Sequence, residues 1–337
     1  MKLFDCFMYN NEDLLLDLRL NILNKFVHKF VIVESRYDHQ GNKKGLNFKI
    51  EKFDKFKDKI EYIILDSFPE KCNSWERENF NRNYIIRGLR EAMPNDYIMI
   101  SDLDEIPKIT DKEIFEKRKY TIFNHKMFYY RFNLHNTTEP KWLGTRACKK
   151  KDLRSPQWIR NKKIKKYPKW RWDKYIKNLN WNVVEDGGWH FSFVMSNSDI
   201  KKKIESFAHS EFNAFEFTNI ENIEKNISSK KDLFGRPFKF VKIEDEKDLP
   251  EYLIRNKDKY ANLFVLPSRF EGSPNILLEV ASLNKLIISA NCNGHQYYYC
   301  YYPQDYRSIS PKTGERSVRS TLKMEMVIIA ERAWPSI

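Results

Sequence analysis

The chain has 337 residues, of which 41% are hydrophobic and 15% aromatic. This composition excludes a disordered chain, and the length suffices for one large domain or two ordinary ones. Lysine and arginine outnumber aspartate and glutamate by 60 to 46, which gives a net charge of +14. The excess suits an anionic partner. We expect a solvated basic surface and no nucleic-acid partner, since the sequence has no zinc-ligand spacing and no RNA-recognition signature.

The five cysteines are scattered and form no Cys-x-x-Cys pair, which predicts reduced thiols and no structural zinc site. They are Cys6, Cys72, Cys148, Cys292 and Cys300. The apolar run at the N-terminus is too short for a signal peptide, and no stretch approaches the length of a membrane span. The sequence therefore predicts a cytoplasmic location, with any membrane contact peripheral at the inner face.

Strands and helices are expected to alternate along the first hundred residues or so. Helical spacing of apolar residues from Leu14 to Phe26 predicts a helix with Asn10 or Asn11 as its N-cap, and a second helix is expected over 75–92. Apolar runs predict strands over 3–9, 30–35, 60–65 and 97–100. The alternation predicts an α/β fold with a mostly parallel sheet and flanking helices.

The strand over 97–100 is followed by three carboxylates and Pro107. Ligands sit at the carboxyl ends of such strands in open α/β sheets. Asp102 and Asp104 would point the same way in extended backbone, and two carboxylates there suit Mg²⁺ or Mn²⁺, which in turn suits a diphosphate. The alternative is an acidic turn that caps a helix starting near Pro107. The Asp-x-Asp pattern alone favours that alternative, because short acidic patterns are common.

Beyond Pro107 the sequence becomes aromatic, and 126–134 predicts a strand that could line a sugar site. Six tryptophans fall between Trp142 and Trp189; we expect most in the core and one or two as sugar platforms. The basic run over 160–166 is interpreted as a solvated surface, with a phosphate contact as the weaker alternative.

A second stretch of candidate functional residues runs from Glu185 through Asp186 and two glycines to His190. The glycines permit close backbone approach. A tight turn into a strand, with a structural histidine, is an equally weighted interpretation. Another histidine, His209, lies two residues before Glu211.

Several of these stretches, in one order over about residues 1–240, resemble glycosyltransferase family 17. They cover 4–7, 11–21, 30–35, 75–78, 82–83, 100–107, 188–192 and 232–236. The shared order is more specific than any single motif, and it favours a functional role for Asp102 and Asp104. The resemblance implies a GT-A-like domain over 1–244.

The resemblance also implies a reaction. A sugar, N-acetylglucosamine from UDP-GlcNAc, would pass with inversion to a hydroxyl of a glycan acceptor. Asp102 and Asp104 would hold Mn²⁺ or Mg²⁺ and the diphosphate, and His190 or His209 would complete the metal shell. The sequence shows no membrane anchor like that of the eukaryotic members, so a bacterial or viral cell-surface glycan is at least as good a candidate acceptor as a complex N-glycan.

The donor side and the base are assigned less directly. The resemblance makes Glu34, Arg77 and Arg82 donor-side groups, and arginine's forked donors suit phosphate. An inverting transfer needs a general base, for which we name Asp186 and then Glu185, because both lie beside the flexible Gly-Gly pair. A nucleotidyltransferase or hydrolase, and a non-catalytic carbohydrate- or nucleotide-sugar-binding protein, remain alternatives.

Residues 262–294 resemble instead the donor-binding segment of glycosyltransferase family 4, a GT-B fold. That resemblance implies a partial Rossmann-like βαβ unit in which Glu271 and Glu279 contact the donor. Most of a GT-B enzyme is missing, so we interpret 245–337 as an appended remnant. An accessory nucleotide-binding lobe is the alternative.

Overall fold

The computed structural model describes residues 1–162, 164, 170, 179–243, 245–263, 307–309 and 316–318. The chain divides into two units, Met1–Tyr252 and Leu253–Ile337. Within the described residues, no helix combines the length and the apolar character that a bilayer crossing requires. Cys6, Cys72 and Cys148 are free thiols, as predicted. The segment that resembles family 4 lies outside the described residues beyond position 263.

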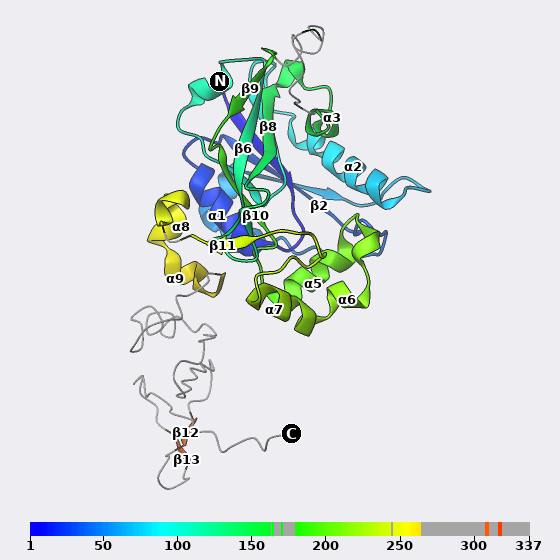
Figure 1. Ribbon diagram of the computed structural model, residues 1–337. Helices are drawn as coiled ribbons and strands as arrows, with labels where there is room; N and C mark the ends of the chain where they lie inside the picture. Colours follow the sequence, from blue (N-terminus) through cyan, green and yellow to red (C-terminus); the bar gives the residue numbers. More distant parts are fainter. Residues whose placement is uncertain are drawn as a thin grey trace. The chain divides into compact units, whose positions relative to one another are not determined.

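An eleven-stranded mixed sheet is the framework of the first unit (Figure 1). Half of it is parallel, in the order β3-β2-β1-β4, and each of these strands lies within one residue of its prediction. Their bounds are Leu3–Met8 (β1), Lys29–Ser35 (β2), Ile60–Leu65 (β3) and Tyr97–Ile100 (β4). Apolar residues run through β1, β2 and β4 almost without a break because these strands are buried on both faces.

The other half of the sheet is largely antiparallel and begins where β8 pairs with β4. The predicted strand over 126–134 is wrong in its bounds, because β6 starts earlier and the chain turns at Tyr130, which has a φ of 61°. The sheet is therefore mixed, and the α/β class is confirmed. The bounds are Glu105–Pro107 (β5), Tyr120–Tyr129 (β6), Leu134–Asn136 (β7), Lys141–Lys149 (β8), Trp181–Val184 (β9), Gly188–Ser192 (β10) and Phe240–Lys242 (β11).

The first helix, α1, spans Asp13–Leu23 and is shorter than predicted. Neither Asn10 nor Asn11 caps it. The residue before the helix is Glu12, whose Oε2 accepts hydrogen bonds from the backbone N–H groups of Asn10 and Asn11. The cap prediction is thus wrong, because Glu12 holds the N-cap position and no side chain makes a cap hydrogen bond to the helix.

The second helix, α2, spans Ser74–Tyr84 and starts with a capping box between Asn73 and Glu76. It gives way to the 3-10 helix η2 (Ile85–Gly88), so the predicted helix to residue 92 is too long. Gly88 packs so tightly on β2 that an added Cβ would lie 2.4 Å from Cγ1 of Val31. Helical backbone thus ends at Gly88, where the chain lies against the sheet.

The remaining helical segments of the first unit surround the sheet. They are η1 (Ile50–Lys59), η3 (Lys112–Phe115), η4 (Lys150–Asp152), α3 (Pro156–Arg160), α5 (Asn197–Ser206), η5 (Ser210–Phe212), α6 (Phe215–Thr218), α7 (Ile220–Ser228) and η6 (Glu246–Asp248). Helix α8 (Glu251–Arg255) spans the unit boundary. The second unit holds α9 (Lys257–Tyr260), η7 (Ala261–Leu263) and the antiparallel pair β12 (Arg307–Ile309) and β13 (Arg316–Val318).

Strand alternation sorts the core of the parallel half onto two faces. Phe4, Cys6 and their counterparts on β2 and β4 pack with η2 and α3 residues in one buried cluster. Asp5 and Phe7 point to the other face, where Arg19 of α1 pairs with Asp5 and lies over the ring of Phe7. One face therefore carries a buried apolar cluster, whereas the other carries a buried ion pair.

Helix α5 lies at the carboxyl ends of β1, β2 and β4, where a ligand is expected. Loops after all three strands contact it. The contacts are Asn11 Nδ2 to Asp199 Oδ1 (3.4 Å), His39 N to Ser206 O (3.2 Å) and Lys203 Nζ to Asp104 Oδ2 (3.1 Å). This helix therefore belongs to the wall of any donor site at that edge of the sheet.

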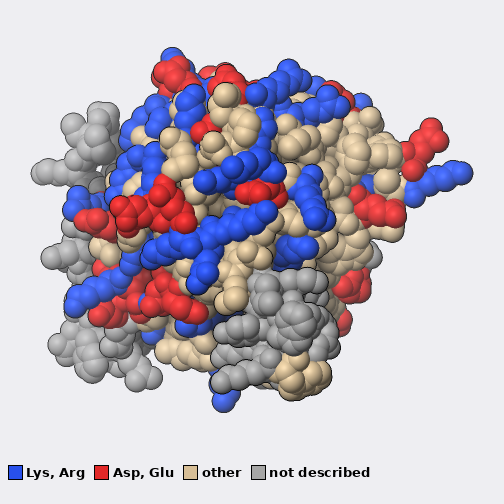
Figure 2. Space-filling view, turned by 90° about the horizontal axis from the view of Figure 1, so that it is seen from above, with Lys and Arg blue, Asp and Glu red and all other residues tan. Residues whose placement is uncertain are grey.

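Basic side chains are spread over the face drawn in Figure 2 and lie among acidic ones. This distribution agrees, on that face, with the solvated basic surface that the composition predicts.

Candidate functional site

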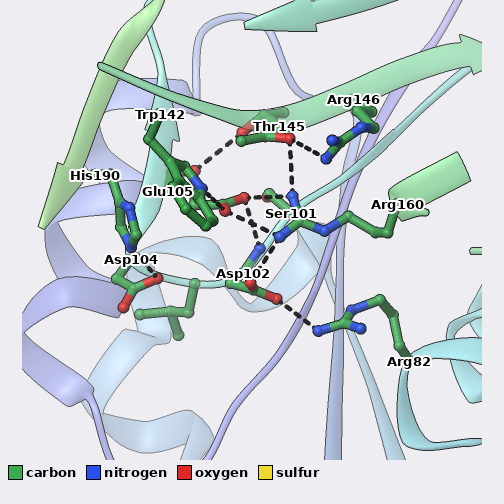
Figure 3. A network of polar contacts seen from close by, with 12 residues as sticks. Arg82, Ser101, Asp102, Asp104, Glu105, Trp142, Thr145, Arg146, Arg160 and His190 are labelled. Carbon is green, nitrogen blue, oxygen red and sulfur yellow. Dashed lines mark hydrogen bonds and ion pairs between the residues drawn. The ribbon is translucent and has the colours of Figure 1, made fainter. Parts of the chain in front are cut away.

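The loop that joins β4 to β5, residues 101–105, is called the acidic loop below. It is a turn, since the N–H of Glu105 donates to the carbonyl of Asp102 at 3.1 Å. The prediction that Asp102 and Asp104 point the same way is therefore wrong, because it assumed extended backbone. Figure 3 shows the two carboxylates facing different partners. The helix alternative is wrong as well, because Pro107 ends strand β5.

Both oxygens of Asp102 face guanidinium groups. Arg82 of α2 donates to Oδ1 at 3.1 Å, and Arg160 of α3 donates to Oδ2 at 2.8 Å (Figure 3). Burial acts to raise the pKa of Asp102, but the charges of Arg160 and Arg82 outweigh it and hold the pKa well below its usual value. Asp102 is thus an ionised carboxylate whose side chain remains 36% exposed.

Glu105 is the buried centre of the same network. It accepts from Trp142 Nε1 at 2.7 Å and from Arg160 Nη1 at 2.8 Å. Burial opposes its ionisation, yet Arg160 lowers its pKa below the usual value. The carboxyl group fills the space beside Gly144, where an added Cβ would lie 2.9 Å from Glu105 Cδ.

Arg160 therefore bridges Asp102 and Glu105, and its side chain is only 10% exposed. The interpretation of 160–166 as a solvated basic surface is wrong at this residue. Its neighbour in space, Arg146, is also buried, and burial together with the charge of Arg160 lowers the pKa of Arg146 to about 10.

Asp104 faces a different set of groups. Lys203 of α5 donates to its Oδ2 at 3.1 Å, and Nε2 of His190 lies 3.6 Å from its Oδ1. Strand β10 places His190 opposite Glu105 in the sheet register. The ring of Trp142 lies against His190, with centroids 5.3 Å apart, and 39% of Trp142 is exposed. Asp104 thus pairs with a lysine and lies beside a histidine, and the partly exposed Trp142 packs against that histidine.

Arg19 is fully buried and supports the acidic loop through hydrogen bonds. Its guanidinium pairs with both carboxylate oxygens of Asp5, at 2.8 and 2.6 Å. The same group donates to Ser101 Oγ and to three backbone carbonyls. Those carbonyls belong to Asp102 (3.1 Å), Leu103 (3.2 Å) and Glu105 (2.7 Å). Arg19 thereby fixes the turn that the acidic loop makes.

Of the three predicted donor-side groups, Arg82 reaches the acidic loop, whereas Glu34 and Arg77 hold neighbouring loops. Glu34 is fully buried and accepts from the backbone N–H of Asn47 at 2.8 Å and from the hydroxyl of Tyr62 at 2.7 Å. Arg77 donates to the carbonyl of His39 at 3.1 Å. The last two residues therefore shape the loop that follows β2.

Glu185 and Asp186 lie on the turn before β10, away from the acidic loop. The turn is tight, with a φ of 48° at Asp186, and Glu185 accepts from Asn124 at 2.8 Å and Lys141 at 2.9 Å. Asp186 and His190 are four positions apart, which is roughly 13 Å along an extended strand. The structure does not bring this pair of carboxylates beside Asp104.

His209 also lies apart from the acidic loop. The ring centroids of His209 and Trp75 lie 4.6 Å apart with the rings nearly perpendicular, and Nδ1 of His209 lies 2.7 Å from Glu211 Oε1. Among the described residues, no three or more His, Cys, Asp or Glu side chains gather as a metal site. As they lie, the predicted ligands do not fit one shared divalent cation, because Asp102 faces two arginines and Asp104 faces a lysine. A requirement for Mn²⁺ or Mg²⁺ stays a prediction.

Comparison with known proteins agrees with the family resemblance. Residues 1–145 match the model of glycosyltransferase family 17. The human beta-1,4-mannosyl-glycoprotein 4-beta-N-acetylglucosaminyltransferase is 32% identical over 108 residues, which cover 29% of this chain and 20% of that protein. The rat and mouse proteins of the same name are 32% and 31% identical with the same coverage.

The aligned part spans about a fifth of the length of these relatives. The predicted resemblance to family 17 is confirmed for the matched part of the chain, residues 1–145. That part contains Arg19, Arg82 and the acidic loop. Arg160, His190 and Lys203 come from the sequence after it. The partners of the two aspartates are thus contributed partly from beyond the matched range.

Proposed function

We propose that this chain is a glycosyltransferase that moves a sugar from a nucleotide-sugar donor to a hydroxyl of a glycan acceptor. The main support is the position of the acidic loop, which lies at the carboxyl end of β4 inside the family 17 match. Ligands of open α/β sheets bind at that edge. The names of the relatives support N-acetylglucosamine as the sugar and a β-1,4-mannosyl glycan as the acceptor, and the resemblance to family 17 adds UDP-GlcNAc as the expected donor.

The donor's diphosphate would lie over the acidic loop, between α2 and α5. Sugar transfer requires that the charge developing on the leaving diphosphate be stabilised. Arg82 suits this role because it sits at the loop and a guanidinium forks onto phosphate oxygens. Its Nη1 and Nη2 bind Gln157, Glu78 and Asp102, and its Nε is buried and, among the described residues, has no hydrogen-bond partner.

The acceptor would approach beside Trp142. Its indole face is partly open, and aromatic faces pack against the C–H surface of sugars. The hydrogen bond from its Nε1 to Glu105 fixes the ring, so the platform is preorganised. The base is not assigned by these contacts. Asp186 or Glu185 in that role stays a prediction, and it requires the acceptor to extend to the turn before β10.

A cytoplasmic location with peripheral membrane contact and a glycan as partner also belong to this proposal. The resemblance of 262–294 to family 4 adds a second nucleotide-binding segment as a prediction, and the proposed reaction does not depend on it.

Calorimetric titration of nucleotide sugars tests the donor site. We expect UDP-GlcNAc to bind one site, and Arg82→Met to weaken binding at least about tenfold, as loss of a charge-assisted hydrogen bond implies. Arg87→Met is the matched control, since Arg87 is exposed on the turn that follows α2 and should change nothing. Thermal unfolding of both variants verifies their fold. If a folded sample binds no nucleotide sugar from a panel of uridine, guanosine and cytidine donors, the proposal is wrong.

A further inference from the structure

We infer that Lys203 occupies the position of the divalent cation in this donor site, so that the chain binds a nucleoside diphosphate without a metal ion. This inference rests on the proposed function, because it concerns the same site. The Asp-x-Asp pattern predicts a metal ion, but the two aspartates contact arginine and lysine side chains instead.

The position of the ammonium group is the first argument. Lys203 Nζ lies 3.1 Å from Asp104 Oδ2 and 3.7 Å from Glu12 Oε1, so carboxylates from the loops after β4 and β1 converge on it. Carboxylate oxygens from separate loops are the usual shell of a hard cation. Here the fixed positive charge between them belongs to the chain itself.

The way the lysine is held is the second argument. Helix α5 carries it, and the side chain of Ser196 caps the start of that helix. The ammonium also lies over the ring of Phe193, 5.6 Å from its centroid. The ion pairs with Asp104 and Glu12 and the capped helix therefore hold the ammonium at a fixed place.

The remaining hydrogen-bonding capacity is the third argument. An ammonium has three N–H donors. Two of them face Asp104 and Glu12, which leaves one for a phosphate oxygen. Because 25% of the Lys203 side chain is exposed, such an oxygen can reach it. Arg82 and Arg160 add two more cations at the adjacent Asp102. Together these three side chains supply the positive charge that a metal would bring.

A variant with an uncharged side chain of similar length at position 203 distinguishes binding through the lysine from binding through a metal ion. Lys203→Met leaves the carboxylates of Glu12 and Asp104 uncovered, with His190 3.6 Å from the latter. The two carboxylates that the ammonium now joins are oxygen ligands of the type that Mn²⁺ accepts. The variant is therefore expected to lose diphosphate affinity and to gain affinity for the metal. Lys202→Met is the matched control, since the adjacent Lys202 is exposed and pairs with Asp199 on its own helix.

The experiment is calorimetry with UDP as the probe, in chelator and in Mn²⁺, on the full chain. We expect wild type and Lys202→Met to bind equally well in both. We expect Lys203→Met to bind at least about tenfold more weakly in chelator, the effect of losing one charge-assisted hydrogen bond. Titration of Mn²⁺ alone should give tighter binding to Lys203→Met than to wild type. Thermal unfolding verifies that both variants are folded.

Two results would overturn the inference while the proposed function stands. One is UDP binding by wild type that requires Mn²⁺, and the other is unchanged UDP binding by Lys203→Met. Failure of wild type to bind UDP or any other nucleotide in either condition would overturn the inference and the proposed function together.

Discussion

Replacement of Arg19 by methionine should be among the most destabilising single changes in the first unit. Arg19 and Asp5 are both fully buried and share two hydrogen bonds, at 2.8 and 2.6 Å. The methionine side chain fills similar space but leaves the Asp5 carboxylate buried and uncompensated. It also removes the donors that hold the backbone carbonyls of the acidic loop.

The expected magnitude follows from the burial of the pair. Breaking a buried ion pair from one side costs about 3–5 kcal/mol. Arg36 pairs with Asp66 at 2.7 Å, but the two side chains are 45% and 74% exposed. Loss of such an exposed pair costs about 0–1 kcal/mol. Arg36→Met is therefore the control for removing an arginine from an Arg–Asp pair at similar distance.

Urea denaturation of the two variants measures the difference in the free energy of unfolding. The double variant Arg19→Met/Asp5→Leu should be less destabilised than the sum of its single changes, because it leaves no unpaired buried charge. If Arg19→Met were no more destabilising than Arg36→Met, the assignment of Arg19 as the support of the acidic loop would be refuted.

Two further predictions concern the same network. Burial lowers the pKa of His125 to about 4, so the unfolded chain takes up the proton first as the pH falls from 6.5 towards 4. The shift corresponds to about 3 kcal/mol of folding stability lost over that pH range. Denaturation of His125→Gln at several pH values should show a smaller loss, and an equal dependence of stability on pH in the variant would contradict this. Gly144→Ala should cost about 1–3 kcal/mol, since its Cβ would press on Glu105. An added Cβ at Gly45 has no atom within 4 Å, so Gly45→Ala should leave the midpoint of thermal unfolding nearly unchanged. Equal effects at both glycines would contradict the packing argument.

The sequence predicts the parallel strands well because each is a short apolar run that the core requires. β3 and β4 have the predicted bounds, Ile60–Leu65 and Tyr97–Ile100. Helix ends were predicted less well, since they depend on contacts distant in the sequence. The helical backbone that follows α2 stops at Gly88, which lies against Val31, and no local signal marks that contact.

The acidic residues of the site were found from the sequence, but their partners were mostly missed. Asp102 and Arg160 are 58 positions apart, and a run of basic residues gives no indication that one member is buried. Lys203 lies on a helix whose docking on the strand ends is a tertiary feature. Arg19 left only a weak signal, because it stands between Leu18 and Leu20 of α1 but Asp17 lies two positions before it, and its burial shows only in the structure.

Product formation tests the proposed transfer most directly. The chain would be incubated with UDP-GlcNAc and a panel of glycans, including β-1,4-linked mannosides, and both the glycan masses and the released UDP would be measured. We predict that one glycan gains a single N-acetylhexosamine and that UDP appears in equal amount. UDP release that does not rise when any glycan is added, with no glycan gaining mass, would contradict a glycosyltransferase that uses this donor.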